Sequence, residues 1–154
     1  MDSVWQREST IRHSAILARS YLHFTKRILL PGLFNPLGLS RNLFHAPFVL
    51  VSHGTEVDPM LNYGNAAALN LWEMSWEELT STPSRLTAET PEREERGRLL
   101  AQVTEHGFID DYTGIRISKS GRRFRIGRAT VWNLVTEHGE PCGQAATFDR
   151  WDYL

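Results

Sequence analysis

The chain has 154 residues and a mass of 17.6 kDa, which allows one domain of ordinary size with a single packed core. Seventeen Lys and Arg residues against eighteen Asp and Glu residues give a formal net charge of −1, so no net field steers DNA or another polyanion to it. Hydrophobic residues at 41% and charged residues at 23% exclude the composition of a disordered protein. We therefore expect a globular protein that does not bind nucleic acid.

The sequence also points to a compartment. No apolar stretch approaches the roughly 20 residues of a membrane span, and the first residues lack the basic start and apolar run of a signal peptide. The single cysteine, Cys142, cannot form an internal disulfide or a cysteine-based zinc site. We expect a cytoplasmic protein with no membrane partner.

Residues 1–43 are predicted to precede a domain at residues 44–154. Over residues 3–30 apolar side chains recur at steps of three and four, which is typical of an amphipathic helix of roughly 25 residues. A Pro-Gly pair ends this helix, and residues 31–42 predict an apolar loop. Such a helix and loop either cap their own domain or meet a second copy of themselves, so a homodimer through the N-terminal helix is one expectation.

Two strands and a helix are predicted at the start of the domain. The β-branched run at residues 48–51 is short and bounded by turn residues, as in a buried strand, and a shorter strand is predicted at residues 60–63. Asn65 then opens a helix over residues 66–72, because its side-chain oxygen can accept a hydrogen bond from an amide of the first helical turn.

Two further helices carry start signals. Ser75 and Glu78 have the spacing of a capping box for a short helix over residues 76–80. Thr90 as N-cap, followed by a proline, predicts a longer helix that ends at Gly107.

The rest of the sequence has a period of two. It predicts three strands, at residues 115–118, 123–135 and 143–148, and Gly127 marks a bulge in the second. The order of elements predicts an α+β fold in which an antiparallel sheet carries helices on one face and is preceded by the amphipathic helix.

Several segments resemble a known family. Residues 62–72 and the Ser-Trp-Glu-Glu-Leu run at residues 75–79 resemble the second strand and first helices of PAS domains. Four further segments are similar to the MEKHLA domain, a PAS-like domain found alone in bacteria and at the C-terminus of plant class III homeodomain leucine-zipper proteins. They are Val51-Ser52-His53-Gly54-Thr55 with Asp58-Pro59, Pro83-Ser84-Arg85-Leu86, Gly107-Phe108-Ile109-Asp110-Asp111-Tyr112-Thr113-Gly114 and Ala129-Thr130-Val131-Trp132-Asn133-Leu134.

The resemblance covers about residues 44–148. It implies a PAS-like five-stranded antiparallel sheet closed on one face by helices, and a sensory or regulatory role. It brings no established ligand or reaction.

A cavity between such a sheet and its helices is expected to have apolar walls and a few polar groups that orient a ligand. We name eight candidate lining residues: Asn65, Leu69, Trp72, Ile115, Ile117, Thr130, Trp132 and Gln144. The apolar members fit a filled core equally well, and Asn65 fits a helix cap. Thr130 and Gln144 need a polar partner if they face inward, and a register error of one residue would place either in water.

Flavin, haem and a metal ion each need particular residues in a protein. Flavin-binding light sensors of the PAS class use a cysteine in an Asn-Cys-Arg-type helix motif, whereas Cys142 lies at the final predicted hairpin. Haem sensors place a histidine on the long helix; His106 ends this helix, where a histidine also suits the helix dipole. The six histidines show no His-Glu-x-x-His spacing. We predict no metal and no haem, and we leave the cofactor open.

Catalytic signals are weak. His53 with Asp58 has the composition of a general base and its orienting carboxylate, but these residue types are also common in turns. Asp110 and Asp111 are neighbours in a predicted strand, so their side chains face opposite sides and cannot share a proton. The basic cluster at residues 122–128 fits an anion site, and it also fits a solvated strand edge that is protected against aggregation.

The sequence therefore predicts a sensory or regulatory module without catalysis, which binds a small molecule or a partner protein and signals through packing or association. A ligand-free dimerisation scaffold with a filled core is the alternative. A small-molecule enzyme that uses His53 is the minor alternative.

Overall fold

The computed structural model describes residues 3–154. Its helical elements are the 3-10 turn η1 (Val4–Gln6), α1 (Glu8–Thr25), α2 (Pro36–Phe44), α3 (Ala66–Trp72), α4 (Trp76–Leu79), the 3-10 turn η2 (Ser84–Thr87) and α5 (Thr90–His106). Its strands are β1 (Val49–His53), β2 (Leu61–Gly64), β3 (Phe108–Ile117), β4 (Arg123–Val135), β5 (Pro141–Phe148) and β6 (Arg150–Tyr153). No helix within the described range is long and apolar enough to cross a membrane.

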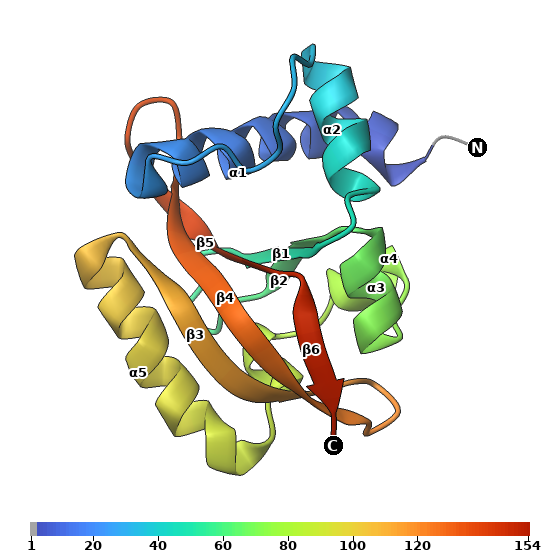
Figure 1. Cartoon of the computed structure of the whole chain (residues 1–154), viewed down its shortest axis with the longest axis vertical. Coiled ribbons are helices and arrows are strands. Elements are labelled where there is room, and N and C mark those ends of the chain that lie inside the picture. Colours follow the sequence, from blue (N-terminus) through green and yellow to red (C-terminus); the bar gives the residue numbers. More distant parts are fainter. Residues whose placement is uncertain (1–2) are drawn as a thin grey trace.

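The strands form one antiparallel sheet in the order β2-β1-β5-β4-β3, as the predicted fold requires. β6 was not predicted. It pairs with residues 124–127 of β4, beyond the part of β4 that pairs with β5 (Figure 1). The bend at Asp149 separates β5 from β6, and the four polar and aromatic residues that follow are too short a run to show a strand period.

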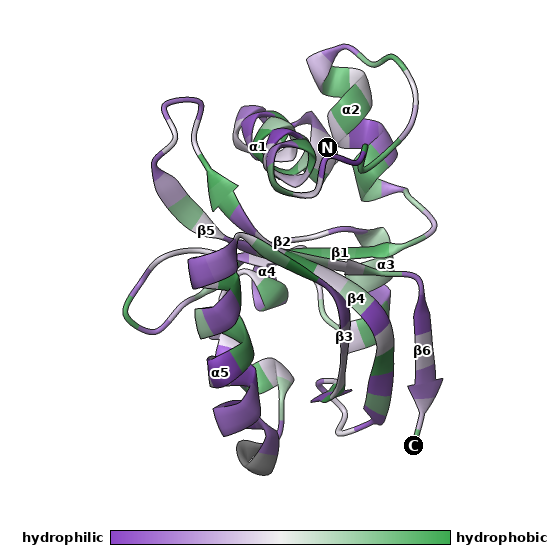
Figure 2. Cartoon of the chain, turned by 60° about the vertical axis from the view of Figure 1, so that its left-hand side comes forward, coloured by the Kyte–Doolittle hydropathy of each residue, from purple (hydrophilic) through white to green (hydrophobic). Residues whose placement is uncertain are grey.

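Helices cover both faces of the sheet (Figure 2). The helices α3, α4 and α5 lie on one face, as predicted, and the N-terminal helices α1 and α2 lie on the other. On the α1 face the rings of Tyr21 and Trp132 meet edge to face, with centroids 4.9 Å apart. On the α5 face Leu99 and Val103 pack with Val131. The sheet is therefore a single layer between two hydrophobic clusters.

The N-terminal helix is shorter than predicted. Helix α1 spans 18 residues and ends at Thr25; the next residue, Lys26, has a φ of 61° in the left-handed region, so the chain turns before the Pro-Gly pair. Thr25 stabilises this end: its hydroxyl donates to the Tyr21 carbonyl at 2.6 Å and accepts from the Arg27 amide at 3.1 Å.

The prediction of an apolar loop over residues 31–42 was wrong for its second half, which forms α2. The Asn35 side chain accepts a hydrogen bond from the Gly38 amide at 2.7 Å, and Pro36 occupies the first helical turn. Leu43 on this helix is fully buried with Leu17 of α1 and Leu50 of β1. Helices α1 and α2 thus share a core with the sheet, and the division at residue 44 stays a prediction.

Three helices in the middle of the chain start where the sequence predicts, except that the cap of one is shifted by one residue. Asn65 caps α3 by accepting from the Ala68 amide at 3.1 Å, and the capping box of Ser75 and Glu78 opens α4. The cap of α5 is Glu89, one residue before the predicted Thr90, because Glu89 already has extended backbone angles and Thr90 is helical.

Strand β3 begins directly after Gly107, earlier than predicted. Two aspartates and a glycine are weak strand formers, and their presence explains why the sequence did not predict the first half of β3. The predicted bulge is present: Tyr112 and Gly114 of β3 pair with Ala129 and Ile126 of β4, so β4 carries one extra residue there. Arg128, in this bulge, has a φ of 47°.

We expect Gly143→Ala to lower the free energy of unfolding by more than about 2 kcal/mol. A Cβ at Gly143 would lie 2.1 Å from the His53 carbonyl oxygen, and its φ is +149°. The matched control is Gly139→Ala in the β4–β5 turn, where φ is +81° and no atom lies within 4 Å of the added Cβ. In this control only backbone strain lowers the free energy of unfolding, by about 1 kcal/mol. Urea unfolding compares the two, and equal losses would contradict the prediction.

Candidate functional site

A cavity of about 70 Å³ lies between α5 and the sheet, with η2 at one end. This volume is several times the ~10–15 Å³ that one water molecule needs. Most of the lining is apolar and comes from β2, α3, α5, β4 and β5: Leu61, Trp72, Leu99, Ile126, Val131 and Phe148. A wider groove of about 600 Å³ adjoins the cavity and shares His53 and Gln144 with it.

Arg116 of β3 is buried at the edge of this cavity, with 7% of its surface exposed. It pairs with Phe124 of β4, and Phe124 belongs to the core on the same face, so Arg116 faces inward. Its guanidinium donates to the Tyr112 hydroxyl at 3.0 Å and to the Ile115 carbonyl at 2.8 Å. Tyr112 thus holds the guanidinium at the cavity.

A second arginine, Arg96 of α5, lines the same cavity and donates to the hydroxyl of Ser84 in η2. Burial, and then the like charge of Arg116, lower the pKa of Arg96 to about 10. Arg96 is therefore charged at neutral pH. Among residues 3–154 no Asp or Glu forms an ion pair with either of them.

Two further polar groups of the cavity lack partners. The Nε2 atom of His53 and the indole Nε1 of Trp72 are buried, and neither has a hydrogen-bond partner in the described part of the chain. The other ring nitrogen of His53 lies 2.9 Å from the Gly54 carbonyl, so it carries the proton and Nε2 is an acceptor. Burial is the largest cause that lowers the pKa of His53, which favours this neutral form.

Gln144 of β5 separates the cavity from the groove. Its amide nitrogen lies 3.0 Å from the Leu100 carbonyl and the Thr104 hydroxyl of α5, and 3.0 Å from the side-chain oxygen of Asn133 on β4. Gln144 therefore ties α5 to the sheet at the edge of the cavity, which supplies the polar partner that an inward glutamine needs.

Of the eight predicted lining residues, the structure brings Trp72 and Gln144 to the cavity, and their role as ligand contacts stays a prediction. Six lie elsewhere: Asn65, Leu69, Ile115, Ile117, Thr130 and Trp132. Asn65 is fully buried, and its amide nitrogen donates to the carbonyls of Leu43 and Phe48.

The strand residues among these six face the other way for a physical reason. Ile115 and Ile117 pair with Arg125 and Arg123, outside the row that Arg116 and Phe124 share. The extra residue of β4 at the bulge changes which residues face α5, so Val131 faces the helix and Trp132 faces α1. A reading with uniform alternation therefore assigns these residues to the wrong face.

Sequence reasoning missed Arg96 and Arg116. A signal for Arg96 was present, because it lies three and seven residues before Leu99 and Val103, on the apolar stripe of α5. The sequence held no such signal for Arg116. It lies between Ile115 and Ile117, and the alternation of the three residues predicts that the isoleucines, and not the arginine, face inward.

The remaining candidates have other partners. Asp58 pairs with Arg85 at 3.2 Å and not with His53, so the suggested pair of general base and carboxylate does not form. Asp110 pairs with Arg27 at 3.5 Å. Cys142 packs with the core on the α1 face, so it is not placed for cysteine photochemistry in this cavity.

In the basic cluster at residues 122–128, Arg123 forms an ion pair with Glu89. The guanidinium of Arg122 lies 3.3 Å from the ring centroid of Tyr153. These contacts account for two of its four arginines.

A polar chain links the sheet to α1 next to the cavity. The Ser52 hydroxyl donates to the side-chain oxygen of Asn62 at 2.6 Å and lies 2.8 Å from Nε2 of His13. Because Ser52 has one hydroxyl proton, His13 donates to Ser52. Burial lowers the pKa of His13 to about 4, so the ring is neutral near pH 7. Ser52 precedes His53, so the cavity and α1 are one residue apart along β1.

Comparison with known proteins identifies the family. The profile of the MEKHLA domain matches residues 11–153, which is most of the chain. The chain belongs to the MEKHLA domain family. No curated protein sequence matches this MEKHLA protein significantly.

Solved structures of PAS type share the fold of this MEKHLA protein. A PAS domain from Colwellia psychrerythraea aligns with a TM-score of 0.60 at 14% identity, over 75% of this chain and 92% of that one. An RNA-binding light-oxygen-voltage receptor aligns with a TM-score of 0.61 at 16% identity, over 78% of this chain and 33% of that one. A light-oxygen-voltage domain studied with a flavin analogue gives a TM-score of 0.56 at 16% identity, over 75% and 84%.

We expect the free energy of unfolding to fall by up to about 3 kcal/mol through His13 as the pH decreases. In the unfolded chain His13 takes up its proton near pH 6.5, whereas the folded protein binds it only near pH 4, so acid in this window favours unfolding. His53, whose pKa is also lowered, acts in the same direction.

Urea unfolding at pH 7.5 and pH 4.5 checks this prediction. The variant His13→Gln removes the titrating group and should flatten the pH dependence. The control His138→Gln changes an exposed turn residue and should leave the pH dependence as it is. An unchanged pH dependence in His13→Gln would contradict the assignment.

Proposed function

We propose that this MEKHLA protein is a sensory module, without catalysis of its own, that binds a small molecule in the cavity between α5 and the sheet. The observation that carries the proposal is a cavity in which two buried polar atoms have no hydrogen-bond partner in the described part of the chain. Buried polar atoms are nearly always hydrogen-bonded, and each one left unpaired costs about 1–3 kcal/mol. A ligand that donates to Nε2 of His53 or accepts from Nε1 of Trp72 recovers part of this energy. The PAS-type fold and the MEKHLA family support the sensory role.

The proposed signal is a change in the packing of α1 on the opposite face of the sheet. A ligand beside His53 shifts the end of β1, and Ser52 transmits the shift to His13 of α1 through their hydrogen bond. To change the populations, the ligand has to prefer one arrangement of α1 by about 1–3 kcal/mol.

A homodimer through the N-terminal segment is the second part of the proposal, and also the basis of the alternative function, a ligand-free dimerisation scaffold. Large apolar side chains are exposed between the end of α1 and the start of α2. They are Leu22, Ile28, Leu33, Phe34 and Leu37. Ile28 is 66% exposed and Leu33 fully so, and burying such a patch against a second copy stabilises a dimer.

We also propose a cytoplasmic location. The one cysteine, Cys142, is a free thiol, and burial raises its pKa, which keeps it protonated. A reducing compartment suits such a residue.

Native mass spectrometry of the freshly purified full chain tests the proposed function. We expect a retained small molecule in the wild type. The variant Ala146→Leu adds bulk at the cavity wall and should lose the molecule, while Ala101→Leu, on the exposed side of α5, should retain it. A clean apo dimer for all three proteins would contradict the sensory function and support the scaffold.

A further inference from the structure

We propose that the ligand of this cavity is a small organic monocarboxylate, whose carboxylate binds Arg96 and Arg116 and whose apolar body packs against Trp72 and Phe148. The inference rests on the proposed function, because it names the chemical class of the molecule that the sensory cavity takes. It is carried by the two unpaired guanidiniums of the cavity.

The charge of the cavity is the first step. Taking a charge out of water without a counter-ion is costly, so buried arginines are normally paired. Some of the exposed arginines of this protein have such partners, as in Arg85 with Asp58 and Arg98 with Glu94. The more buried Arg96 and Arg116 have no acidic partner in residues 3–154, and each repels the other. One carboxylate between them neutralises the excess charge.

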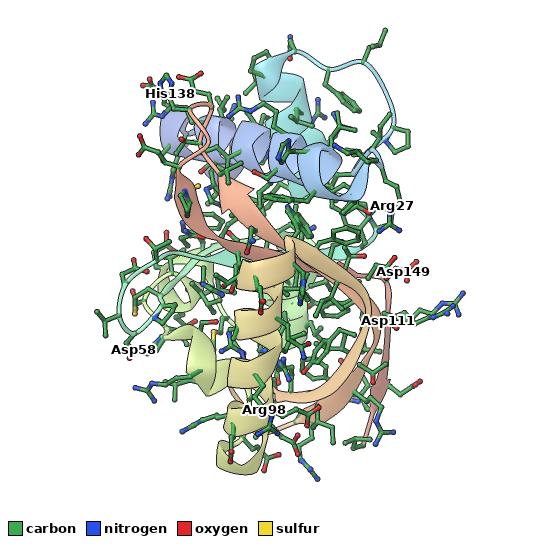
Figure 3. All side chains as sticks on the ribbon, turned by 90° about the vertical axis from the view of Figure 1, so that its left-hand side faces the viewer. Arg27, Asp58, Arg98, Asp111, His138 and Asp149 are labelled. Carbon is green, nitrogen blue, oxygen red and sulfur yellow. The ribbon has the colours of Figure 1, made fainter. Side chains whose placement is uncertain are left out.

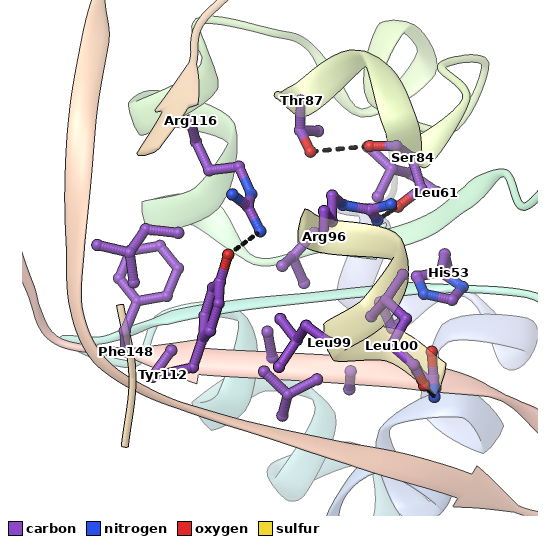
Figure 4. Close-up of a pocket in the computed structure, with 18 of the residues that line it drawn as sticks. His53, Leu61, Ser84, Thr87, Arg96, Leu99, Leu100, Tyr112, Arg116 and Phe148 are labelled. Carbon is purple, nitrogen blue, oxygen red and sulfur yellow. Dashed lines mark hydrogen bonds between the residues drawn. The ribbon is translucent and has the colours of Figure 1, made fainter. Parts of the chain in front are cut away.

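The geometry of the polar end is the second step. The guanidiniums of Arg96 and Arg116 lie in the same part of the cavity as the hydroxyls of Ser84, Thr87 and Tyr112 (Figure 4). The Ser84 and Tyr112 hydroxyls each accept a hydrogen bond from one arginine, which fixes the direction of its remaining N–H groups. A planar guanidinium held in this way matches the two oxygens of a carboxylate.

The apolar walls are the third step, and they select the rest of the ligand. Leu99, Ile126, Val131 and Phe148 line the cavity together with the arginines, and the lining as a whole is mostly apolar. A free phosphate would satisfy the arginines but leave these walls in contact with water. A short aliphatic or aromatic acid meets both, because its hydrocarbon part is removed from water against the same walls. The indole N–H of Trp72 is a further donor at this site.

Many charged side chains lie at the surface of the protein (Figure 3), and one of them supplies the control for the test. Arg98 is labelled there on the same helix as Arg96, and its side chain is exposed. Arg98→Gln removes one positive charge from α5 without touching the cavity, so it matches Arg96→Gln in net charge and in helix.

Thermal shift and calorimetric titration of the full chain test the inference with defined probes. Butyrate and benzoate are the carboxylates, butyramide and benzamide are neutral molecules of the same shape, and inorganic phosphate is the free anion. We expect at least one carboxylate to raise the melting temperature in a concentration-dependent way, since a ligand that binds only the folded state stabilises it. Its matching amide and phosphate should bind at least tenfold more weakly.

The arginine variants locate this binding. Arg116→Gln and Arg96→Gln should each weaken carboxylate binding by about 10- to 100-fold, because each removes charge-assisted hydrogen bonds. Arg98→Gln should bind as the wild type does. Without ligand, Arg96→Gln should melt at the wild-type temperature or above it, because it removes an unpaired charge; a purely structural arginine would lower it. If Arg116→Gln does not fold, Arg96→Lys keeps the charge, loses the planar fork and should still bind more weakly.

Three outcomes overturn the inference. If an amide binds as tightly as its carboxylate and Ala146→Leu blocks it, the ligand is not an acid, while the proposed function stands. If phosphate binds more tightly than either carboxylate, the site is one for inorganic or phosphate anions. If no probe binds and the mass spectrum shows no retained molecule, the inference and the proposed function both fail.

Discussion

Successive residues of a strand face opposite sides of a sheet, and this alternation decides which side chains of the protein can meet. The sheet is a single layer with helices on both faces. In β1, His53 faces the cavity while Leu50 and Ser52 face α1. The cavity and the N-terminal helix α1 therefore lie on opposite sides of the same strand. One peptide unit, between Ser52 and His53, joins the two sides.

The bulge of β4 sets this alternation for the strand that contacts both α1 and α5. Before the bulge Phe124 and Ile126 pack under α3, and after it Ala129 and Val131 lie on that same face. Because of the extra residue, Ala129 and Val131 face α3 and α5, whereas uniform alternation would turn them toward α1. For the same reason Trp132 faces α1, where its ring contacts the ring of Tyr21. One backbone irregularity thus determines both the β4 part of the apolar cavity wall and an aromatic contact of the N-terminal helix.

Local signals in the sequence were enough to predict the order of elements and most of their starts. The Asn65 cap and the Ser75 capping box depend on neighbours within three residues, so the sequence contains all that is needed. Helix α2 carried the same kind of signal in Asn35 and Pro36, which the surrounding apolar residues obscured. The face of Arg116 depends on its pairing with Phe124, and no local pattern contains that register.

The cavity differs from a packing defect in the chemistry of its walls. A filled core would place apolar side chains at positions 96 and 116, since apolar replacement of buried charged groups is often neutral or stabilising. Here Ser84 and Tyr112 instead each hold one guanidinium at the edge of an apolar space. Two charges that repel each other, with polar groups that fix their positions, are the basis of the proposed anion site. The proposed dimerisation scaffold does not account for this arrangement, because the exposed apolar side chains on which that alternative rests lie on the N-terminal segment, on the opposite face of the sheet.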